Sequence, residues 1–568
     1  MFLANLKERL ASLLSVSADD FVYPVPAELG DLSLPLFALA KSSGLSPAAL
    51  AQEKIKLLEQ SDLPEAIQSF RAVGPYLNFF FKAGVFNREA LFDIEKTGPD
   101  FGRLAVGRQQ KVMLEYSNAN THKEYHIGHL RNLFFGDAVF RILAFNDYRA
   151  IPVSYINDFG IHVAKTLWQW QRANYKDVDA PKGWLLGKCY AEASNLLLQA
   201  EIKEDGGLEK EKMKTEISTV MKEIESRQGK NYELWQETRA WSIAYFAEIY
   251  QRFGVRFEHI FYESEVIDDG LKMVAEFLQR GILKNNQGAV IADLEEYGLG
   301  VLPIIRSDGT ALYPVADLAL ARLKFNEYHL DESVYIVDVR QGLYFKQLAK
   351  IFELAGENLK ISHLGYDFVT LRGGMMSSRN GNVITYSQIW DEAYTRARHE
   401  VATRHQDWEI KRIESTAEKL AVAALKFEML KVRADKIITF DMDEALRFDG
   451  FTAAYLQYTG ARLASILRKN ETLTADYSLL IHGKELSLAI MMQRFPEAVA
   501  KAGFQRDPSI LARYLFDLSQ VFNDYYHEVA ILKAEPALSS ARIGLLRSLR
   551  QVLVNGFSLL GFDYLEEM

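Results

Sequence analysis

One stretch of the chain decides its fold: residues 111–143, which read KVMLEYSNANTHKEYHIGHLRNLFFGDAVFRIL. The first four residues form a short apolar run typical of a buried strand, and from residue 130 apolar side chains recur at helical spacing. The polar turn between them therefore lies at the carboxyl end of a strand and the amino end of a helix. Free backbone N–H groups at such a helix start favour a phosphate, and Gly128 lets that backbone come close to a ligand.

Two histidines flank this glycine. His126 and His129 are three residues apart, so on a first helical turn both side chains can point the same way. Imidazoles placed there can donate hydrogen bonds to phosphate oxygens. The alternative is a pair of capping or core histidines. A zinc site is disfavoured because no cysteine lies near, the only one in the chain being Cys189.

The composition is that of a large globular protein. Of 568 residues, 49% are hydrophobic and 25% charged, and the length predicts about three or four domains. One cysteine excludes a disulfide framework and suits a reducing compartment. No apolar run approaches the roughly 20 residues that span a bilayer, and residues 1–10 read as an amphipathic helix rather than a signal peptide. We therefore expect a cytoplasmic protein without membrane contact. The net charge of −9 argues weakly against nucleic acid, so RNA contact would need a local basic face.

The polar turn resembles that of a known enzyme family. His-Ile-Gly-His at residues 126–129 matches a signature of class I aminoacyl-tRNA synthetases, and residues 116–123 resemble the arginyl-tRNA synthetases in particular. Ala119 stands where that family usually has proline, which removes no side chain that the chemistry needs. The resemblance implies ATP as its Mg²⁺ complex, L-arginine and tRNA(Arg) as partners, and no structural metal.

A second family signature, Lys-Met-Ser-Lys-Ser, should follow, and residues 372–383 occupy its place about 250 residues further on. Both lysine positions are lost, becoming Met375 and Ser378. Negative charge builds on the pyrophosphate leaving group, and the resemblance implies Lys123 and Arg379 as the cations beside it. A flexible Gly-rich surface turn is the alternative for this loop taken alone. The implied catalytic residues are His126, His129, Lys123 and Arg379, and the implied ATP contacts are His126, Gly128, His129, Met376, Ser377 and Ser378.

Arginine would be held by acids, because a guanidinium is planar, permanently charged and best bound by carboxylates. Residues 306–319 resemble the family segment in which Tyr313 and Asp317 face the guanidinium, and Glu263 resembles the other acidic contact. Without the resemblance, Asp317 would read as a helix-surface acid. Most family members carry histidine where this chain has Tyr344. The implied arginine contacts are Glu115, Ser117, Asn120, Glu263, Tyr313, Asp317 and Gln341.

Three segments of the chain differ in character. Residues 1–95 predict an α+β domain, with residues 73–81 as a strand, and resemble the family's domain that touches the outer corner of tRNA. Asn78 and Phe80 are its candidate RNA contacts, with strand core as the alternative for Phe80. Residues 106–390 predict the catalytic domain, an α/β, doubly wound, Rossmann-type parallel sheet with a helical insertion near residues 200–235.

The third segment, residues 410–568, reads as wholly helical and predicts an all-α bundle. It resembles the family's anticodon-binding domain. Tyr455, Gln457 and Arg462 are candidate tRNA contacts, because aromatic rings stack on unpaired bases and arginine reaches phosphates. Ordinary bundle packing is the alternative for the tyrosines.

The resemblance implies an arginine–tRNA ligase, expected to be a monomer, that forms arginyl-adenylate from L-arginine and ATP and transfers the arginyl group to the 3′ end of tRNA(Arg). One alternative is a class I synthetase for another amino acid. The other is a synthetase-derived RNA-binding or regulatory protein without aminoacylation, which the loss of both loop lysines favours.

Overall fold

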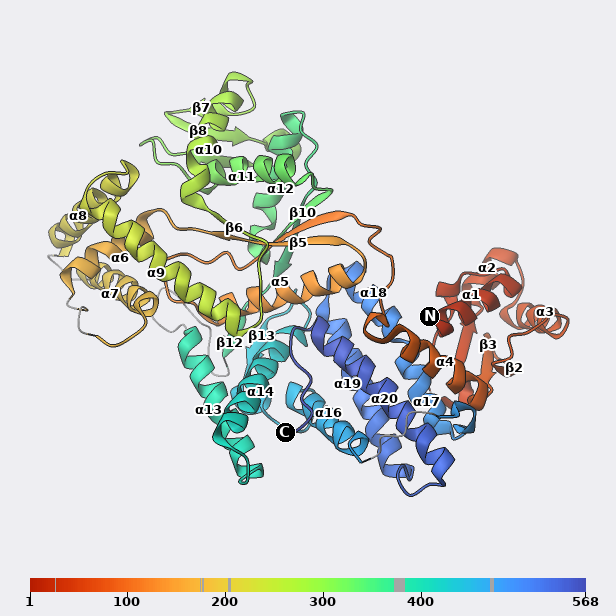
Figure 1. The fold of residues 1–568 in the computed structure, drawn as a ribbon. Coiled ribbons are helices and arrows are strands. Elements are labelled where there is room, and N and C mark those ends of the chain that lie inside the picture. Colours follow the sequence, from red (N-terminus) through yellow and green to blue (C-terminus); the bar gives the residue numbers. More distant parts are fainter. Residues whose placement is uncertain (26, 174, 176–177, 203–205, 372–383, 470–474) are drawn as a thin grey trace.

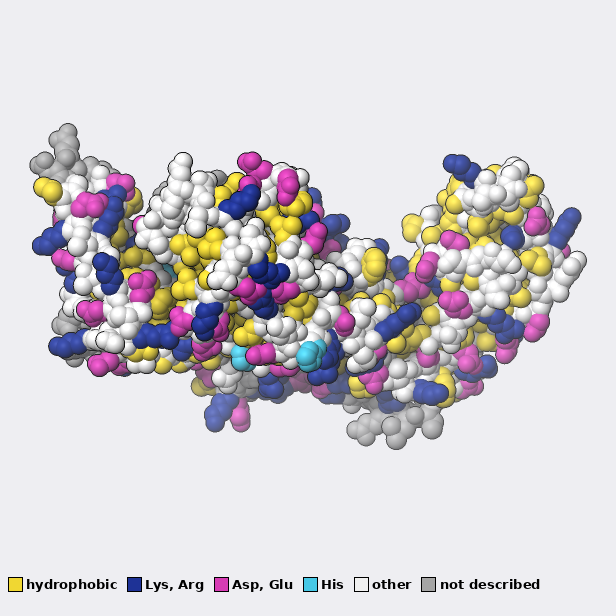
Figure 2. Space-filling model, turned by 90° about the horizontal axis from the view of Figure 1, so that it is seen from above, with side chains coloured by type: hydrophobic (Ala, Val, Ile, Leu, Met, Phe, Trp, Pro, Cys, Tyr) yellow, Lys and Arg dark blue, Asp and Glu magenta, His cyan; other side chains and the backbone are white. Residues whose placement is uncertain are grey.

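A computed structural model describes the chain from residue 1 to residue 568, apart from residues 26, 174, 176–177, 203–205, 372–383 and 470–474. An amino-terminal region, a central region and a carboxyl-terminal region follow one another along the chain, and the carboxyl-terminal helices pack against both of the others (Figure 1). At the right of Figure 2, the amino-terminal region forms a lobe that stands apart from the central region.

The amino-terminal region combines helices with a small antiparallel sheet of strand order β1-β3-β2, as the α+β prediction requires. Its elements are α1 (Phe2–Leu14), β1 (Leu32–Pro35), α2 (Phe37–Ser43), α3 (Pro47–Glu59), β2 (Ile67–Val73), β3 (Tyr76–Phe81) and α4 (Ala83–Thr97). The expectation of one strand over residues 73–81 is wrong. Gly74 has a left-handed φ of 57°, so the chain reverses there and the segment becomes the end of one strand and the whole of the next.

The central region is built on a parallel sheet of five strands in the order β11-β10-β4-β5-β6. These strands are β4 (Lys111–Glu115), β5 (Arg149–Ile156), β6 (His259–Tyr262), β10 (Glu332–Asp338) and β11 (Ile361–Tyr366). From β4 the chain proceeds outward to β5 and β6 and later returns to the other side of β4 with β10. The strand order therefore reverses between β4 and β10, which is where open α/β sheets bind ligands.

Helices cover both faces of this sheet, which confirms the doubly wound prediction. Val112 and Leu114 of β4 join a core with α5 (Ile127–Phe145), whereas Met113 between them joins a core with α10 (Glu263–Gln279) and α11 (Tyr313–Tyr328). The next helix, α12 (Gly342–Leu354), follows β10. The helices α5, α10, α11 and α12 all begin on the side of the sheet where the strands end.

Two insertions interrupt the central region. Between β5 and β6 lie α6 (Ile161–Arg172), α7 (Lys182–Ile202), α8 (Gly206–Glu225) and α9 (Lys230–Arg252), which share a hydrophobic core of their own. These helices extend well beyond the expected residues 200–235. Between α10 and α11 lies an antiparallel sheet of β7 (Lys284–Asn286), β8 (Ala289–Asp293) and β9 (Val301–Ile305), which the sequence analysis did not foresee.

The carboxyl-terminal region is helical, as predicted. Its helices are α13 (Tyr386–Arg404), α14 (Ile410–Leu430), α15 (Met442–Ala445), α16 (Ala453–Leu467), α17 (Gly483–Gln493), α18 (Phe495–Gln505), α19 (Pro508–Glu528) and α20 (Pro536–Leu559). One short strand is an addition to the prediction. β13 (Ile438–Phe440) pairs in parallel with β12 (Val369–Leu371) of the central region and buries Ile438 and Phe440.

One hydrophobic core joins the three regions, extending from α1 through α5 to α20. Polar contacts reinforce this junction: the backbone N–H of Leu3 donates to Gln493 Oε1 at 3.2 Å, and Lys7 pairs with Glu497 at 3.0 Å. Within the described ranges, no helix has the length and apolar character that crossing a bilayer would require.

Candidate active site

A cavity of about 980 Å³ lies where β4, β5 and β10 end, and we call it the central cavity. The starts of α5, α11 and α12 form much of its wall. Among the residues singled out from the sequence, those that line it are Glu115, Asn120, His126, Gly128, His129, Tyr313, Asp317 and Gln341. Residues from distant parts of the chain thus meet at the point where the strand order reverses.

His126 and His129 begin α5 and bind its backbone. The Gly128 N–H donates to His126 Nδ1 at 3.1 Å, and the His126 N–H donates to His129 Nδ1 at 3.3 Å. The two rings stack with centroids 3.7 Å apart. Burial, and then the charge of Lys123, lowers the pKa of His126 to about 4, and burial lowers the pKa of His129 well below its usual value. Both rings are therefore neutral near pH 7.

The caps also fix the tautomer of each ring. Because Nδ1 accepts a backbone N–H in both histidines, the single proton of each neutral ring must sit on Nε2. The helix start thus offers two Nε2–H donors. Gly128 permits this arrangement, since a Cβ on this residue would lie 3.0 Å from Cε1 of the His126 ring.

Lys123 lies beside this helix start but not in the lining of the central cavity. Its ammonium sits 4.9 Å from the centroid of the Tyr190 ring, and burial lowers its pKa. Its charge contributes to the lowered pKa values of both His126 and His129, so the ammonium influences the electrostatic potential at the start of α5. The other residues assigned to the leaving group and to ATP, Met376, Ser377, Ser378 and Arg379, lie outside the described residues.

Two carboxylates near the site come from α10 and α11. Asp317 of α11 lines the central cavity and accepts a hydrogen bond from the Tyr344 hydroxyl. Glu263 begins α10, and its Oε2 accepts from Asn157 Nδ2, a lining residue, at 2.9 Å. Burial raises the pKa of each carboxyl to about 7. Neither carboxylate forms a salt bridge with any lysine or arginine in the described part of the chain. Tyr313 stands at the rim, 66% exposed.

Glu115 differs from these two acids because its charge is already balanced. It pairs with the buried Lys324 of α11, and Asn118 Nδ2 donates to its Oε1 at 2.8 Å. Asn120 and the exposed Gln341 line the central cavity without such a partner charge.

Ser117 is not in the central cavity, contrary to the sequence-based assignment. Its backbone has a left-handed φ of 60°, which turns the side chain into the core. There Ser117 Oγ donates to the Tyr250 hydroxyl at 2.9 Å and lies 2.9 Å from the Tyr125 hydroxyl. The serine therefore ties the turn to α9 instead of facing a ligand.

Several lining residues were missed by sequence reasoning. Asp338 ends β10 and pairs with Arg340 at 2.7 Å, and the Arg340 guanidinium lies 4.3 Å from the centroid of the Phe368 ring. Tyr155 near the end of β5 and Tyr335 in β10 also line the central cavity. Asp338 and Tyr155 share a position at or near the end of a buried apolar strand, which is where a parallel sheet places its ligand, whereas Tyr335 lies in the middle of β10 and carried no such signal.

The candidate RNA contacts in the amino-terminal region differ in exposure. Asn78 is 2% exposed, and its side-chain oxygen accepts from Ser33 Oγ at 2.5 Å, so the structure contradicts a surface role for this side chain. Phe80 is partly exposed, and the Arg71 guanidinium lies 4.6 Å from its ring centroid. β3 alternates its side chains across the small sheet, but both of its faces are largely covered, which the sequence pattern did not reveal.

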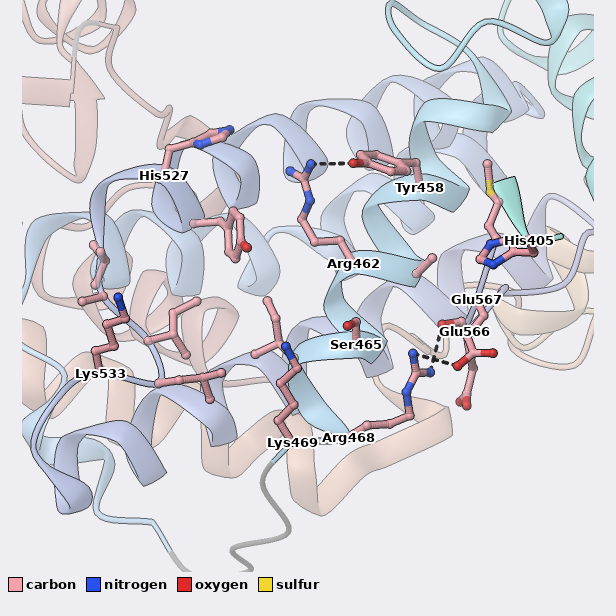
Figure 3. Close-up of a pocket in the computed structure, with 18 of the residues that line it drawn as sticks. His405, Tyr458, Arg462, Ser465, Arg468, Lys469, His527, Lys533, Glu566 and Glu567 are labelled. Carbon is pink, nitrogen blue, oxygen red and sulfur yellow. Dashed lines mark hydrogen bonds and ion pairs between the residues drawn. The ribbon is translucent and has the colours of Figure 1, made fainter. Parts of the chain in front are cut away.

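A second cavity, of about 860 Å³, lies in the carboxyl-terminal region (Figure 3), and we call it the carboxyl-terminal cavity. Arg462 of α16 points into it, donates to the Tyr458 hydroxyl at 3.0 Å and lies 5.2 Å from the centroid of the Tyr526 ring. Other basic residues of the lining are His405, Arg468, Lys469, His527 and Lys533. Glu566 and Glu567 also line the cavity, and Arg468 pairs with Glu567 at 2.9 Å, so among the described residues the unpaired positive charge comes mainly from Arg462, Lys469 and Lys533.

Tyr455 and Gln457 do not line the carboxyl-terminal cavity. Gln457 is fully buried, donates to the Asp563 carbonyl at 2.6 Å and accepts the Leu565 N–H at 2.9 Å, so its assignment as an RNA contact is contradicted. The Tyr455 hydroxyl accepts from Asn523 Nδ2 at 2.7 Å. Of the three candidate contacts in α16, only Arg462 lines this cavity, because the helix turns the other two toward its neighbours.

Three family models match the chain. They are "tRNA synthetases class I (R), catalytic domain" over residues 98–441, "Arginyl tRNA synthetase N terminal domain" over residues 3–81, and "DALR anticodon binding domain" over residues 456–568. The first alone covers more than half of the chain.

Relatives and solved structures agree with these models. An arginine–tRNA ligase of Bdellovibrio bacteriovorus is 35% identical over 566 residues, which cover 98% of this chain and 96% of the relative. One of Treponema pallidum is 31% identical, with 96% and 94% covered. The structure of a Thermus thermophilus arginyl-tRNA synthetase matches with a TM-score of 0.83 and 29% identity, and all of both chains is covered.

Proposed function

The chain belongs to the class I arginyl-tRNA synthetases, and we propose that the central cavity is where it activates arginine. It is an arginine–tRNA ligase, which joins L-arginine to ATP as arginyl-adenylate, releases diphosphate and transfers the arginyl group to the 3′ end of tRNA(Arg). The observation that carries the placement is that the central cavity is lined by a helix start suited to phosphate and by the Asp317 carboxylate, with Glu263 bound to the lining residue Asn157. Among the described residues, neither carboxylate has a cation in a salt bridge with it. These features match the two ends of an arginyl-adenylate.

ATP enters as its Mg²⁺ complex and places its phosphates at the start of α5. The Nε2–H groups of His126 and His129 donate to phosphate oxygens, and Gly128 leaves room for the backbone to approach them. Lys123, together with Arg379 from outside the described residues, balances the charge that develops on the departing pyrophosphate. Met376, Ser377 and Ser378, which lie outside the described residues, are the further ATP contacts that the family resemblance implies.

Arginine lies with its guanidinium between Glu263 and Asp317, and Tyr313 covers it from the rim. A guanidinium offers five N–H donors in one plane, so two carboxylates from different helices can bind it together. Asn120, Gln341 and Glu115 face the α-ammonium and carboxylate end. That carboxylate then points toward α5 and attacks the α-phosphate. A neutral analogue such as citrulline leaves the two acids without a cation and is rejected.

The carboxyl-terminal cavity is the proposed site for unpaired bases of tRNA(Arg). Tyr458 and Tyr526 offer aromatic faces, and Arg462, Lys469 and Lys533 offer positive charge. Phe80 with Arg71 forms a second, smaller aromatic and basic surface on the amino-terminal lobe. Residues 1–95, 106–390 and 410–568 would thus serve as tRNA-corner, catalytic and anticodon-binding domains. The enzyme is proposed to act as a monomer in the cytoplasm, as the sequence analysis expects.

ATP–pyrophosphate exchange with each of the standard amino acids, in the presence and absence of tRNA(Arg), tests this proposal. Of the amino acids tested, only arginine should support exchange. Glu263→Gln and Asp317→Asn should each abolish most of it while ATP binding to the same variants persists. Full exchange with arginine in both variants would remove the arginine site from the central cavity.

A further inference from the structure

We propose that Tyr344 is a positioning residue that holds the Asp317 carboxylate in the orientation in which it binds the guanidinium of arginine. This inference rests on the arginine site proposed above and adds a residue for which the family motif offers no counterpart, since histidine is usual at this position. Tyr344 lies in the first turn of α12 and Asp317 in the second turn of α11, and both line the central cavity.

The hydrogen bond between the two side chains gives the two oxygens of the Asp317 carboxylate different roles. The Tyr344 hydroxyl donates to Oδ2 of Asp317. Among the described residues, no other side chain donates to this carboxylate, so Oδ1 is left for a ligand. One oxygen is therefore fixed by the protein, and the other is aimed by that bond into the cavity.

The tyrosine ring is itself held in place. It packs edge-on against Phe345, with centroids 5.2 Å apart and planes at 74°. Phe345 in turn stacks on His363 of β11 at 5.4 Å and packs against Tyr335 of β10 at 4.7 Å. The hydroxyl is thus positioned through an aromatic stack that rests on the parallel sheet, so it can orient Asp317 before arginine arrives.

Asp317 needs such a donor because its surroundings disfavour a negative charge. Among the described residues, the titratable groups that face it are Glu115 of β4, Tyr155 of β5, Glu263 of α10, Tyr313 and Lys324 of α11, Tyr335 of β10 and Tyr344 of α12. The one cation in this set, Lys324, is engaged by Glu115. Burial and the charge of Glu115 raise the pKa of Asp317, and the Tyr344 hydrogen bond opposes that rise.

Tyr344→Phe removes only the hydroxyl oxygen and tests the inference. Arginine binding is measured by calorimetry on the enzyme–tRNA(Arg) complex, and KM and kcat by ATP–pyrophosphate exchange. We expect the Kd and the KM for arginine to rise about tenfold, since a hydrogen bond to a charged group is lost. The value of kcat should stay within about threefold, because the reacting atoms are untouched. The pH midpoint of kcat/KM for arginine should move upward, a change that a general loss of packing would not produce.

Two further variants separate the possible explanations. Tyr344→His keeps an N–H donor and should recover most of the arginine affinity that Tyr344→Phe loses. Tyr328→Phe makes the same one-oxygen change at the far end of α11, away from the central cavity, and should leave the KM for arginine unaltered.

The inference is overturned if Tyr344→Phe binds arginine as the parent does, or if Tyr344→His is as weak as Tyr344→Phe. Asp317→Asn distinguishes this failure from failure of the proposed function. If Asp317→Asn weakens arginine binding and Tyr344→Phe does not, the arginine site stands and the role of Tyr344 is wrong. If neither variant changes binding, the arginine site itself is misplaced.

Discussion

The imidazole ring of His126 has two roles: one nitrogen caps α5, and the other can donate a hydrogen bond to a phosphate. Its Nδ1 satisfies the Gly128 N–H at the start of α5, and this same bond forces the proton onto Nε2. His129 repeats the arrangement with the N–H of His126. The two readings of these histidines that the sequence left open, as caps or as phosphate ligands, are therefore compatible in one geometry.

Replacing either histidine should impair catalysis far more than folding. We predict that His126→Ala and His129→Ala each lower kcat for ATP–pyrophosphate exchange about 100-fold or more, because each removes a donor aimed at the developing charge. The KM for arginine should change little, since the carboxylates proposed to hold its guanidinium come from α10 and α11 and not from α5. Initial rates over a range of arginine concentrations give both constants.

The chain provides a matched control for these variants. His482 caps α17 in the same manner, with its Nδ1 accepting the Lys484 N–H at 3.2 Å, but it lies in the carboxyl-terminal region. His482→Ala removes a similar helix cap, so it should lower the free energy of unfolding by about 1 kcal/mol and leave kcat unchanged. A comparable loss of kcat in His482→Ala would show that capping alone explains the effect at residues 126 and 129.

Arginine affinity should depend on pH through Glu263 and Asp317. Burial raises the pKa of each to about 7, so below that pH both are largely protonated and present no charge to a guanidinium. We predict that kcat/KM for arginine rises between about pH 6 and pH 8 and then levels off. The rate of ATP–pyrophosphate exchange at subsaturating arginine, measured across this pH range, gives kcat/KM at each pH. A flat profile would contradict the raised pKa values.

The same pKa values set an opposite trend in the stability of the ligand-free protein. A carboxyl whose pKa is raised in the folded state binds its proton more tightly there than in the unfolded chain. These two groups therefore favour the folded state at low pH, and that contribution is lost as the pH rises through about 7. Bound arginine should offset the loss, so its effect on the melting temperature should grow with pH.

At the residue scale, the motifs grouped side chains from distant segments that do line one cavity, and the ligand contacts of these side chains stay a prediction. His126, His129 and Asp317 meet in the central cavity because strand and helix ends are fixed by the apolar pattern around them. Ser117 and Gln457 were misjudged for a different reason. A left-handed φ at one, and the rotation of a buried helix at the other, decide which way each side chain points, and neither is visible in the local sequence.

Among the elements, α5 is the one that connects the central cavity with the carboxyl-terminal region. Arg131, in the second turn of α5 and 1% exposed, donates through Nη2 to the carbonyls of Ala434 at 2.9 Å and Lys436 at 2.8 Å. These residues precede β13, which pairs with β12. One guanidinium thus fixes the β12–β13 pair against the helix that begins with the two histidines.

Removing this guanidinium should destabilise the junction. Arg131→Met keeps much of the side-chain volume but leaves the Lys436 carbonyl without its donor and the Ala434 carbonyl with only the Asp367 N–H, at a cost of about 2 kcal/mol. We predict a fall of about 2 °C in the midpoint of thermal unfolding. Arg433→Ala is the control, since Arg433 only forms an exposed ion pair with Asp435 and should change the midpoint by less than about 1 °C. Equal midpoints for both variants would refute the assigned role of Arg131.

Element boundaries were predictable where periodicity was strong and hidden where tertiary pairing decides. The strand at β4 and the helix at α5 follow directly from their apolar patterns. In the second inserted sheet, β7 is three residues long and exposed, whereas β8 and β9 bury alternate side chains, a pattern that the sequence analysis overlooked. β13 is three residues long and exists because β12, far away in the sequence, supplies its hydrogen-bonding partners.

At the scale of the whole molecule, the charge balance must be read locally. The chain carries 75 acidic and 66 basic residues, yet basic groups gather around the carboxyl-terminal cavity. Arg462 is central to this group because it bonds to Tyr458 and Asn523 at 3.0 Å each and lies close to Tyr526. It holds two aromatic rings in place and adds charge between them.

Loss of Arg462 should therefore affect tRNA and not arginine. We predict that Arg462→Ala raises the KM for tRNA(Arg) about tenfold or more, because stacking and charge are both lost. The KM for arginine, measured with saturating tRNA, should stay the same. Arg513→Ala is a suitable comparison, since Arg513 also lies over aromatic rings of this region but outside the cavity. Equal tRNA kinetics in the two variants would place the RNA elsewhere.

The separate core of α6–α9 has a consequence for how the protein melts. α1, α5 and α20 share one continuous core, so the amino-terminal, central and carboxyl-terminal regions should lose their structure as one cooperative unit. The inserted helices share a separate core around Trp168 and Trp235, but α9 also buries Phe246 and Ile249 in the main core. A calorimetric trace should accordingly contain a smaller, separable transition for α6 and α8, while α9 melts with the rest of the protein.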